Sequence, residues 1–335
     1  MRRVAGILSR TPRQPLRTSQ HAHRRLSGEE LPAATKASSI ELTKKARIDD
    51  AVEAILSACF EHWSANEAVV LSGVDPEGIH QMRVALRRMR AALADFKKII
   101  PAAQLAWLKR ETKWLVTNLG MARDWDVFLA ELLAPVMAAR PRNSSLERLR
   151  VAADIERRKG YLIAQSAIRS ARYAALIQRM RPWLSARAWR DNGKGEPFGG
   201  RAAKLATQSL KKRKAAVLTR GHDFSELTPL ERHRLRIALK RLRYTAEFFS
   251  SLFPGKRRKA YLHSLSLLQD NLGHMNDVVV AEHLLGRLLT RRGKKARALA
   301  TAIGMVIGWH ACSAVSSESI AIENWREFCD SDLFW

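Results

Sequence analysis

Four basic side chains between residues 80 and 90 recur at the three- and four-residue spacing of one helix face. At about 100° of rotation per residue, they fall within about 80° of one another. These residues are His80, Arg83, Arg87 and Arg90. Arginine can hold two phosphate oxygens at once, so this face is suited to binding an anion. A helix rises about 1.5 Å per residue, so the stripe is about 15 Å long and favours an extended chain of phosphates over a single phosphate group.

The same pattern returns 153 residues further along the chain. Residues 80–90, HQMRVALRRMR, align without a gap with residues 233–243, HRLRIALKRLR. The second basic stripe consists of His233, Arg236, Lys240 and Arg243. The caps and breakers around it keep the same offset, pairing Asp75-Pro76 with Thr228-Pro229, Asn118-Leu119-Gly120 with Asn271-Leu272-Gly273, and Asp124 with Asp277. An internal repeat of this kind predicts two halves of one architecture.

The charges of these stripes have few local partners. A charged helix face is ordinarily solvated, and its cations pair with acidic residues three or four positions away. No Asp or Glu lies between Gly78 and Ala94, or between Arg232 and Ala246. The cations therefore repel one another, and a bound polyanion would relieve that repulsion. We predict polyanion binding here, with an ordinary solvated surface as the alternative.

The two histidines of the stripes could bind a metal or donate to phosphate. A metal site needs further ligands, yet positions three and four residues after each histidine hold only Arg83, Val84, Arg236 and Ile237. We therefore expect no metal site. A protonated imidazole that donates to phosphate suits the cationic surroundings, and a histidine that merely caps or packs is the alternative.

Residues 120–127, GMARDWDV, resemble a pair of carboxylates for acid–base work. However, Asp124 follows Gly120, a residue that commonly ends a helix, so we expect Asp124 to cap a helix or to pair with Arg123. Walker-type loops, G-x-S-x-G elbows and H-E-x-x-H are absent from the sequence. We expect no enzymatic activity and no cofactor.

The elements that must position these residues are helices. Apolar residues recur at three- and four-residue spacing and almost no segment alternates with period two, so we expect an all-α fold of about ten helices. The core side of the basic helices is predicted to consist of Met82, Leu86, Met89, Leu93, Phe96, Leu235, Leu239, Leu242 and Phe249. We place the first helical half at residues 41–190 and the second at 201–335, joined near 191–200.

Composition bounds the partner and the compartment. The 335 residues contain 59 Lys and Arg against 32 Asp and Glu, a formal net charge of +27. Nucleic acid, an anionic membrane surface and polyphosphate are all suitable partners for such a charge. The three cysteines, Cys59, Cys312 and Cys329, are far apart and indicate a reduced, cytoplasmic setting.

Two segments at the margins need an interpretation of their own. Residues 1–28 hold seven arginines and no acidic residue, a composition typical of a disordered basic arm, which we extend over 1–40; a transit peptide is the alternative. The uncharged run 298–317 carries Gly304 and Gly308 at a spacing used where helices pack closely. We expect this run to be a buried helix and expect no membrane partner.

The motifs resemble those of the CHAD family, the conserved histidine α-helical domain. The resemblance covers residues 49–335 and includes L-G-x-x-R-D-x-D-V at 119–127, K-R-L-R-Y at 240–244 and L-Q-D-x-L-G-x-x-N-D at 268–277. It implies two helical bundles related by a pseudo-two-fold, whose basic helices face each other across a cleft or pore that holds polyphosphate. It also implies association with polyphosphate granules.

By this resemblance the eight residues of the two stripes would contact phosphate, and Lys113 would be a further contact from the next helix. The repeat partner of Lys113 is Ser266, so the two halves differ there. Many relatives carry a triphosphatase domain of the CYTH type, marked by E-x-E-x-K. That motif is absent, and residues 1–48 are too few for such a domain.

The sequence therefore predicts non-catalytic binding of inorganic polyphosphate. The alternative is a nucleic-acid-binding protein, bound through non-specific electrostatics. Single-strand binders usually set aromatic rings among their cations to stack bases. No aromatic residue lies between His80 and Arg90, and only Tyr244 lies beside the second stripe. An enzyme that acts on polyphosphate is a weaker third possibility.

Overall fold

Helices account for nearly all of the computed structural model, which describes residues 32–191, 198–289 and 294–335. Residues 32–335 form one compact unit. Within the described ranges the chain forms no β-strand, and only one isolated bridge pairs Arg47 with Arg201. The predicted all-helical class is confirmed.

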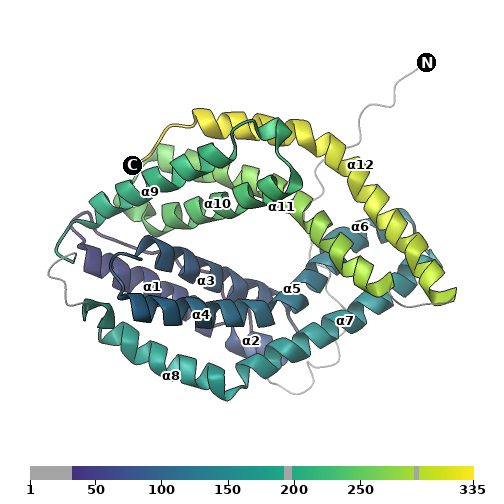
Figure 1. Cartoon of the computed structure of the whole chain (residues 1–335), viewed down its shortest axis with the longest axis horizontal. Coiled ribbons are helices and arrows are strands. Elements are labelled where there is room, and N and C mark those ends of the chain that lie inside the picture. The colour runs from purple at the N-terminus through teal and green to yellow at the C-terminus, as the bar shows by residue number, and fades with distance from the viewer. Residues whose placement is uncertain (1–31, 192–197, 290–293) are drawn as a thin grey trace. The chain divides into compact units, whose positions relative to one another are not determined.

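Figure 1 labels the helices in chain order. The first part of the chain contains α1 (Ile48–Ser64), α2 (Glu67–Ser72), α3 (Pro76–Asp95), α4 (Ala102–Asn118), α5 (Gly120–Val127), a π-helical segment (Phe128–Leu133), α6 (Ala134–Ala139), α7 (Ser144–Ile168) and α8 (Ala171–Ser185). The later part contains α9 (Ala202–Arg220), α10 (Pro229–Phe248), α11 (Lys256–Leu289) and α12 (Lys294–Asp330), with short 3-10 turns at Ala188–Arg190, Phe224–Glu226 and Ser250–Leu252.

The two basic helices, α3 and α10, begin at the predicted caps. The Asp75 side chain accepts a hydrogen bond from the backbone of Glu77, and Pro76 takes the first helical position. Thr228 forms a capping box with Glu231, and Pro229 follows it. These side chains satisfy backbone N–H groups that have no partner inside the helix, and proline loses nothing there. Both helices have 20 residues, and their bounds differ by the 153-residue offset.

The apolar side of each basic helix is buried as predicted. Met82, Leu86, Met89, Leu93 and Phe96 are fully enclosed, and so are the matching residues of α10, Leu235, Leu239 and Leu242. The side chains of α3 pack with α1 and α4, and those of α10 pack with α9 and α11. Each buried leucine or phenylalanine stabilises the fold by roughly 1.5–3 kcal/mol. Burial of this side fixes the orientation of the basic stripe beside it.

Near their C-terminal ends, α3 and α10 contact each other (Figure 1). The Thr245 hydroxyl donates to Asp95 at 2.7 Å, and the guanidinium of Arg213 in α9 approaches the same carboxylate at 2.6 Å. The Arg88 guanidinium lies 5.6 Å from the centre of the Phe248 ring. The position of one basic stripe relative to the other is therefore set by buried contacts between the helices.

The segment before α1 differs from the predicted arm over residues 1–40. From Pro32 onward the chain lies against the helices: Thr35 exchanges two hydrogen bonds with the Asn66 side chain, and Ile40 is 5% exposed. The backbone N–H of Leu42 donates to the Ser251 hydroxyl at 2.8 Å. These contacts leave no periodic pattern in the sequence, so the predicted disordered arm wrongly includes residues 32–40. Residues 1–31, and residues 192–197 of the predicted join between halves, lie outside the described residues.

The uncharged run lies within α12, where Ala302 and Val306 are buried. The expected close packing at Gly304 and Gly308 is wrong, because a Cβ atom at either position would meet nothing within 4 Å. Within the described ranges, no single helix has the length and apolar character needed to cross a membrane. Two parts of α12, Leu299–Ser313 and Glu318–Asp330, meet that requirement only as a pair, bent by 46°.

Candidate functional site

Cations from α3 and α10 gather where the two stripes meet. The electrostatic neighbours of Lys240 are Arg236 on its own helix and Arg83 and Arg87 on α3. We call these four residues, Arg83, Arg87, Arg236 and Lys240, the cationic cluster. His80 lies beside it and interacts with Arg83, Arg87 and Lys240. The structure therefore brings together five of the nine predicted site residues, and they come from both halves of the chain.

Arg83 is held on the first side of the cluster. Its Nη1 donates to the carbonyl of Val116 in α4 at 2.9 Å. A Cβ atom on Gly120 would lie 3.4 Å from that nitrogen, so the start of α5 lies against the guanidinium. Burial lowers the pKa of Arg83 to about 10, while Asp124 opposes the shift. The guanidinium thus enters the site as a partly dehydrated cation that still lacks full compensation.

Arg236 occupies the corresponding position on the second side. Its Nη2 lies 3.6 Å from an oxygen of Asp277 in α11. Burial lowers the pKa of Arg236, and the positive charge of Arg87 lowers it further. The Nε atoms of both Arg83 and Arg236 are buried and have no hydrogen-bond partner among the described residues. Since a buried unsatisfied donor costs about 1–3 kcal/mol, or more when charged, each half holds a donor that an anion would satisfy.

His80 departs from the expected protonated imidazole. Burial, followed by the charges of Arg123, Arg87 and Arg83, lowers the pKa of His80 to about 3. The imidazole is therefore neutral in the unliganded protein at neutral pH. The sequence pattern placed His80 among cations correctly, but it gave no measure of burial, and burial is the largest cause of the shift.

Lys240 is the other group whose charge is suppressed. Burial lowers the pKa of Lys240 to about 7, and Arg236 and Arg87 add to the shift, while Asp277 opposes it. Lys240 is half-buried, and no carboxylate lies within ion-pair distance of its amine in the described part of the chain. Its equivalent in the first half is Arg87, whose guanidinium cannot release its proton under ordinary conditions. The two halves therefore differ chemically at this position.

The sequence suggested that Asp124 caps a helix or pairs with Arg123. The structure shows no cap, and Arg123 is one of the charges that act on this carboxylate. α4 ends at Asn118, but Leu119 keeps a right-handed conformation and α5 begins directly at Gly120, so Asp124 lies inside α5. Burial raises the pKa of Asp124, and the negative charge of Asp277 adds to the shift while Arg83 opposes it. Asp126 is occupied elsewhere, because it accepts from Arg157 at 2.6 Å and from Tyr161 at 2.9 Å. These different partners argue against an acid–base pair.

The remaining predicted site residues lie at the margins. Arg90 is exposed, and it affects the pKa of Arg241 rather than that of Lys240. The Nε of Arg243 donates to Glu247 at 2.7 Å, one turn along the same helix. His233 is exposed near the start of α10, and Lys113 is exposed on α4, one turn before Val116. Arg90, His233 and Arg243 lie on the two helices that form the cluster, and Lys113 lies on α4, whose Val116 carbonyl accepts from Arg83.

Sequence reasoning missed three residues of the site. Arg123 lies close enough to lower the pKa of His80, Asp277 lies beside Arg236, and the Tyr244 hydroxyl accepts from Arg87 Nε at 3.3 Å. All three belong to the motifs at 119–127, 240–244 and 268–277. Only Asp277 has a matching residue at the 153-residue offset, since Arg123 corresponds to Asn276 and Tyr244 to Ala91. The packing of α5 and α11 against the basic helices shows which charges the three residues meet.

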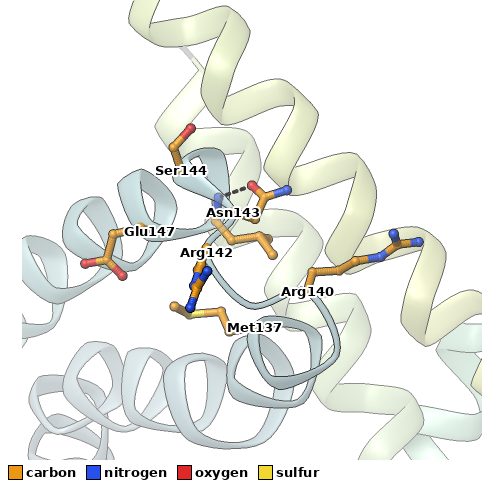
Figure 2. A pocket seen from close by; sticks show the side chains of 7 residues that line it. Met137, Arg140, Arg142, Asn143, Ser144 and Glu147 are labelled. Carbon is orange, nitrogen blue, oxygen red and sulfur yellow. Dashed lines mark hydrogen bonds between the residues drawn. The ribbon is translucent and has the colours of Figure 1, made fainter.

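A pocket of about 280 Å³ lies elsewhere, at the turn between α6 and α7 (Figure 2). It is lined by Met137, Arg140, Arg142, Asn143, Ser144, Leu146 and Glu147. The Asn143 side chain in this turn accepts from the backbone of Ser145 and Leu146 and so caps α7. None of the predicted site residues lines this pocket. We therefore assign the functional site to the cationic cluster and not to the pocket.

Among the described residues, no group of three His, Cys, Asp or Glu side chains is arranged to hold a metal ion. The three cysteines are free thiols, with Cys59 buried and Cys312 exposed. The side chains that gather at the site are thus cationic, with Asp124 and Asp277 beside them. Because the two carboxylates do not balance the cations, the site is suited to binding an anion with several negative charges.

Comparisons with known proteins agree with this architecture. The crystal structure of the CHAD domain from the plant Ricinus communis matches with a TM-score of 0.76 at 33% identity, covering 87% of this chain and 96% of that chain. PptA from Streptomyces chartreusis matches with a TM-score of 0.62 at 17% identity, covering 84% of this chain and 100% of that one, a likeness that shows the fold alone.

Two uncharacterised proteins from strains of Mycobacterium tuberculosis are 30% identical over 217 residues, which is 62% of this chain and 40% of theirs. The chain thus spans less than half the length of these two relatives. The sequence model described as the CHAD domain matches residues 54–286, well over half of the chain. On this match, and on the likeness to the plant domain over nearly its whole length, the chain belongs to the CHAD domain family.

Proposed function

We propose that this protein binds inorganic polyphosphate without catalysis, at a single site shared by α3 and α10. The observation that carries the proposal is the pair of buried Nε donors on Arg83 and Arg236, one from each half, with no acceptor. A polyphosphate chain has acceptor oxygens and negative charge along its whole length, so one chain can satisfy both donors. The CHAD domains are a family associated with polyphosphate, which supports this choice of polyanion.

The helix bounds support a pseudo-two-fold arrangement of the two halves around that site. Shifted by 153 residues, α1 falls on α9, α3 on α10, α4 with α5 on α11, and α7 with the first turns of α8 on α12. The contacts agree with this relation. Arg83 interacts with Lys240 as Arg87 interacts with Arg236, and the repeat exchanges these two pairs. The shared region would be the basic cleft, with Arg87 and Lys240 facing each other near its axis.

The outer stripe residues extend the proposed binding path. Arg90, Arg243, His233 and Lys113 lie on exposed or half-exposed parts of the same helices. A chain longer than the cluster would reach them, and the Glu247 partner of Arg243 would be displaced by phosphate. A cytoplasmic protein of this kind would associate with polyphosphate granules, which present many chains at once.

Nucleic acid is the second candidate, because the net charge of +27 attracts any polyanion. The aromatic side chain nearest to the cluster is unsuited to stacking a base, since Tyr244 is half-buried and its hydroxyl is bonded to Arg87. Base stacking on exposed rings is the usual source of affinity in single-strand binders. This difference favours polyphosphate.

Competition tests the proposal. The full chain is incubated with labelled long-chain polyphosphate, and single-stranded DNA, double-stranded DNA or unlabelled polyphosphate is added at equal phosphate concentration. We expect unlabelled polyphosphate to displace the label at a concentration at least about tenfold lower than either nucleic acid, and the affinity to fall steeply with salt. Equal displacement by nucleic acid would favour the second candidate.

A further inference from the structure

We infer that Lys240 is a site of covalent acylation by acyl phosphates, with the arginines of the cationic cluster holding the phosphate of the donor. The Lys240 amine attacks the carbonyl carbon and forms a C–N bond. The bond between that carbon and the bridging oxygen breaks, and inorganic phosphate leaves with the bonding electrons. The amine nitrogen gives one proton to solvent, and the product is a neutral amide.

Most of the charged groups around the Lys240 amine are cations, which lower its pKa. Arg236 lies on its own helix, and His80, Arg83 and Arg87 face it from α3. Asp277 on α11 is the carboxylate that opposes the shift most among the described residues, and it also lies 3.6 Å from Arg236. Burial and the three nearby guanidinium groups disfavour the charged form of this amine, so it releases its proton more readily than the amine of an exposed lysine does.

Lys240 is the member of the cluster that can relieve this repulsion. A guanidinium keeps its proton in proteins, so the three arginines remain charged. His80 is already neutral at neutral pH, because its pKa is lowered to about 3. With the pKa of Lys240 lowered to about 7, its amine is mostly neutral at pH 8. An ordinary exposed lysine, with a pKa near 10.4, is less than about 1% neutral at that pH.

The same cluster supplies recognition of the donor. An acyl phosphate carries a phosphate group, and the unpaired Nε atoms of Arg83 and Arg236 are donors for its oxygens. Because both arginines neighbour Lys240, a phosphate bound by them would bring the adjacent carbonyl carbon near the amine, and the reaction would proceed within a complex instead of by random collision. The arginines also stabilise the negative charge that builds up on the departing phosphate.

Acylation would change the site in one direction. The amide has no charge, so the cluster loses the positive charge that Lys240 would regain beside a polyanion. The repeat equivalent, Arg87, cannot undergo this reaction, which confines the modification to the second half. The resulting control of polyphosphate affinity rests on the proposed function, whereas the acylation itself requires only the cluster.

The first experiment treats the full chain with acetyl phosphate between pH 6 and 10 and measures acetyl occupancy at each lysine by mass spectrometry. Lys211 on α9 and Lys259 on α11 are exposed and serve as internal controls. We expect Lys240 to be acetylated at least about tenfold faster than either control at pH 7.5. We also expect its rate to level off above about pH 8, while the control rates continue to rise. Equal rates at all three lysines would overturn the inference.

Two further measurements show whether the arginines guide the donor. N-hydroxysuccinimide acetate, which carries no phosphate, is expected to favour Lys240 by a factor at least about threefold smaller than acetyl phosphate does. The Arg236→Gln variant, with folding verified by thermal unfolding, is expected to lose most of the preference for Lys240 with acetyl phosphate. An unchanged preference in both measurements would contradict phosphate guidance.

The last comparison separates this inference from the proposed function. Polyphosphate affinity is measured before and after acetyl phosphate treatment for the parent and for Lys240→Arg, each compared with its own untreated sample. We expect the parent to lose affinity by about threefold or more and the variant to be unchanged. Slow acetylation of Lys240 in a protein that binds polyphosphate refutes the acylation alone. Selective acetylation in a protein that does not bind polyphosphate refutes the proposed function alone.

Discussion

Arg87 on α3 donates a hydrogen bond from Nε to the hydroxyl of Tyr244 on α10, at 3.3 Å and across 157 positions of sequence. The bond links the two basic helices at the residues where their stripes meet. Arg87 also interacts with Arg236 and Lys240, so the bond to Tyr244 holds the Arg87 guanidinium near the cations of the other half. The two stripes therefore interact in the folded protein, and an anion bound at one stripe should change the electrostatic environment of the other.

The buried carboxylate that joins the helices should be a major source of stability. Asp95 is 3% exposed and is bonded to Arg213 and Thr245. Its replacement by alanine leaves the Arg213 charge without a partner, so we expect a loss of about 3 kcal/mol in the free energy of unfolding, measured by urea denaturation. The control is Asp332→Ala, whose pair with Arg257 is 75% exposed on both sides and is expected to contribute less than about 1 kcal/mol. Equal losses would contradict this assignment.

Binding of polyphosphate should be accompanied by proton uptake. A phosphate chain beside Lys240 stabilises the ammonium form and raises its pKa from about 7 toward the ordinary value near 10.4. At pH 8, therefore, binding takes up close to one proton, and the affinity falls as the pH rises from about 7. Calorimetry in buffers of different ionisation enthalpy measures the uptake. In Lys240→Arg most of it should disappear, and uptake that persists there would point to another group, with His80 the nearest.

The first described residues are predicted to support the fold. Ile40 is 5% exposed, and Ile40→Ala is expected to cost about 2–3 kcal/mol in the free energy of unfolding. Deletion of residues 1–40 removes this side chain together with the bonds between Thr35 and Asn66, so it should lower the melting temperature further. Glu41→Ala, at an exposed neighbouring position, is the control. A deletion variant as stable as the full chain would show that this segment is dispensable.

We expect no release of phosphate from polyphosphate, triphosphate or ATP in the presence of Mg²⁺ or Mn²⁺. Asp124 lies beside Arg83 and Asp277, and Asp126 is bonded to Arg157 and Tyr161, so the two carboxylates do not converge. A sensitive assay of released phosphate checks this. Release that disappears in Asp124→Asn would reverse the conclusion and identify that carboxylate as part of an active site.

The sequence predicted the parts of the fold that depend on local pattern. The caps at Asp75 and Thr228, the core side of each basic helix and the all-helical class follow from spacing and residue type, and the structure has each of them. The site was predicted as far as the stripes themselves. Helical periodicity shows which side chains share a face of one helix, but it does not show which other helix packs against that face.

Three of the errors arose where tertiary contact overrides local preference. Gly120 was expected to stop a helix, yet α5 begins there, against the guanidinium of Arg83. His80 was expected to be protonated, but burial is invisible in a sequence and keeps it neutral. Residues 32–40 have no periodicity, so their packing against Asn66 could not be predicted.

The central claim is that one polyphosphate chain is bound by both halves together. Calorimetric titration with long-chain polyphosphate measures affinity and stoichiometry separately for the parent, Arg87→Gln and Lys240→Gln, with the exposed Lys211→Gln as control. The shared site predicts that each of the first two variants loses affinity by about threefold or more at unchanged stoichiometry, because the same ligand contacts both residues. Half the stoichiometry at parental affinity, in either variant, would show two independent sites and contradict the account.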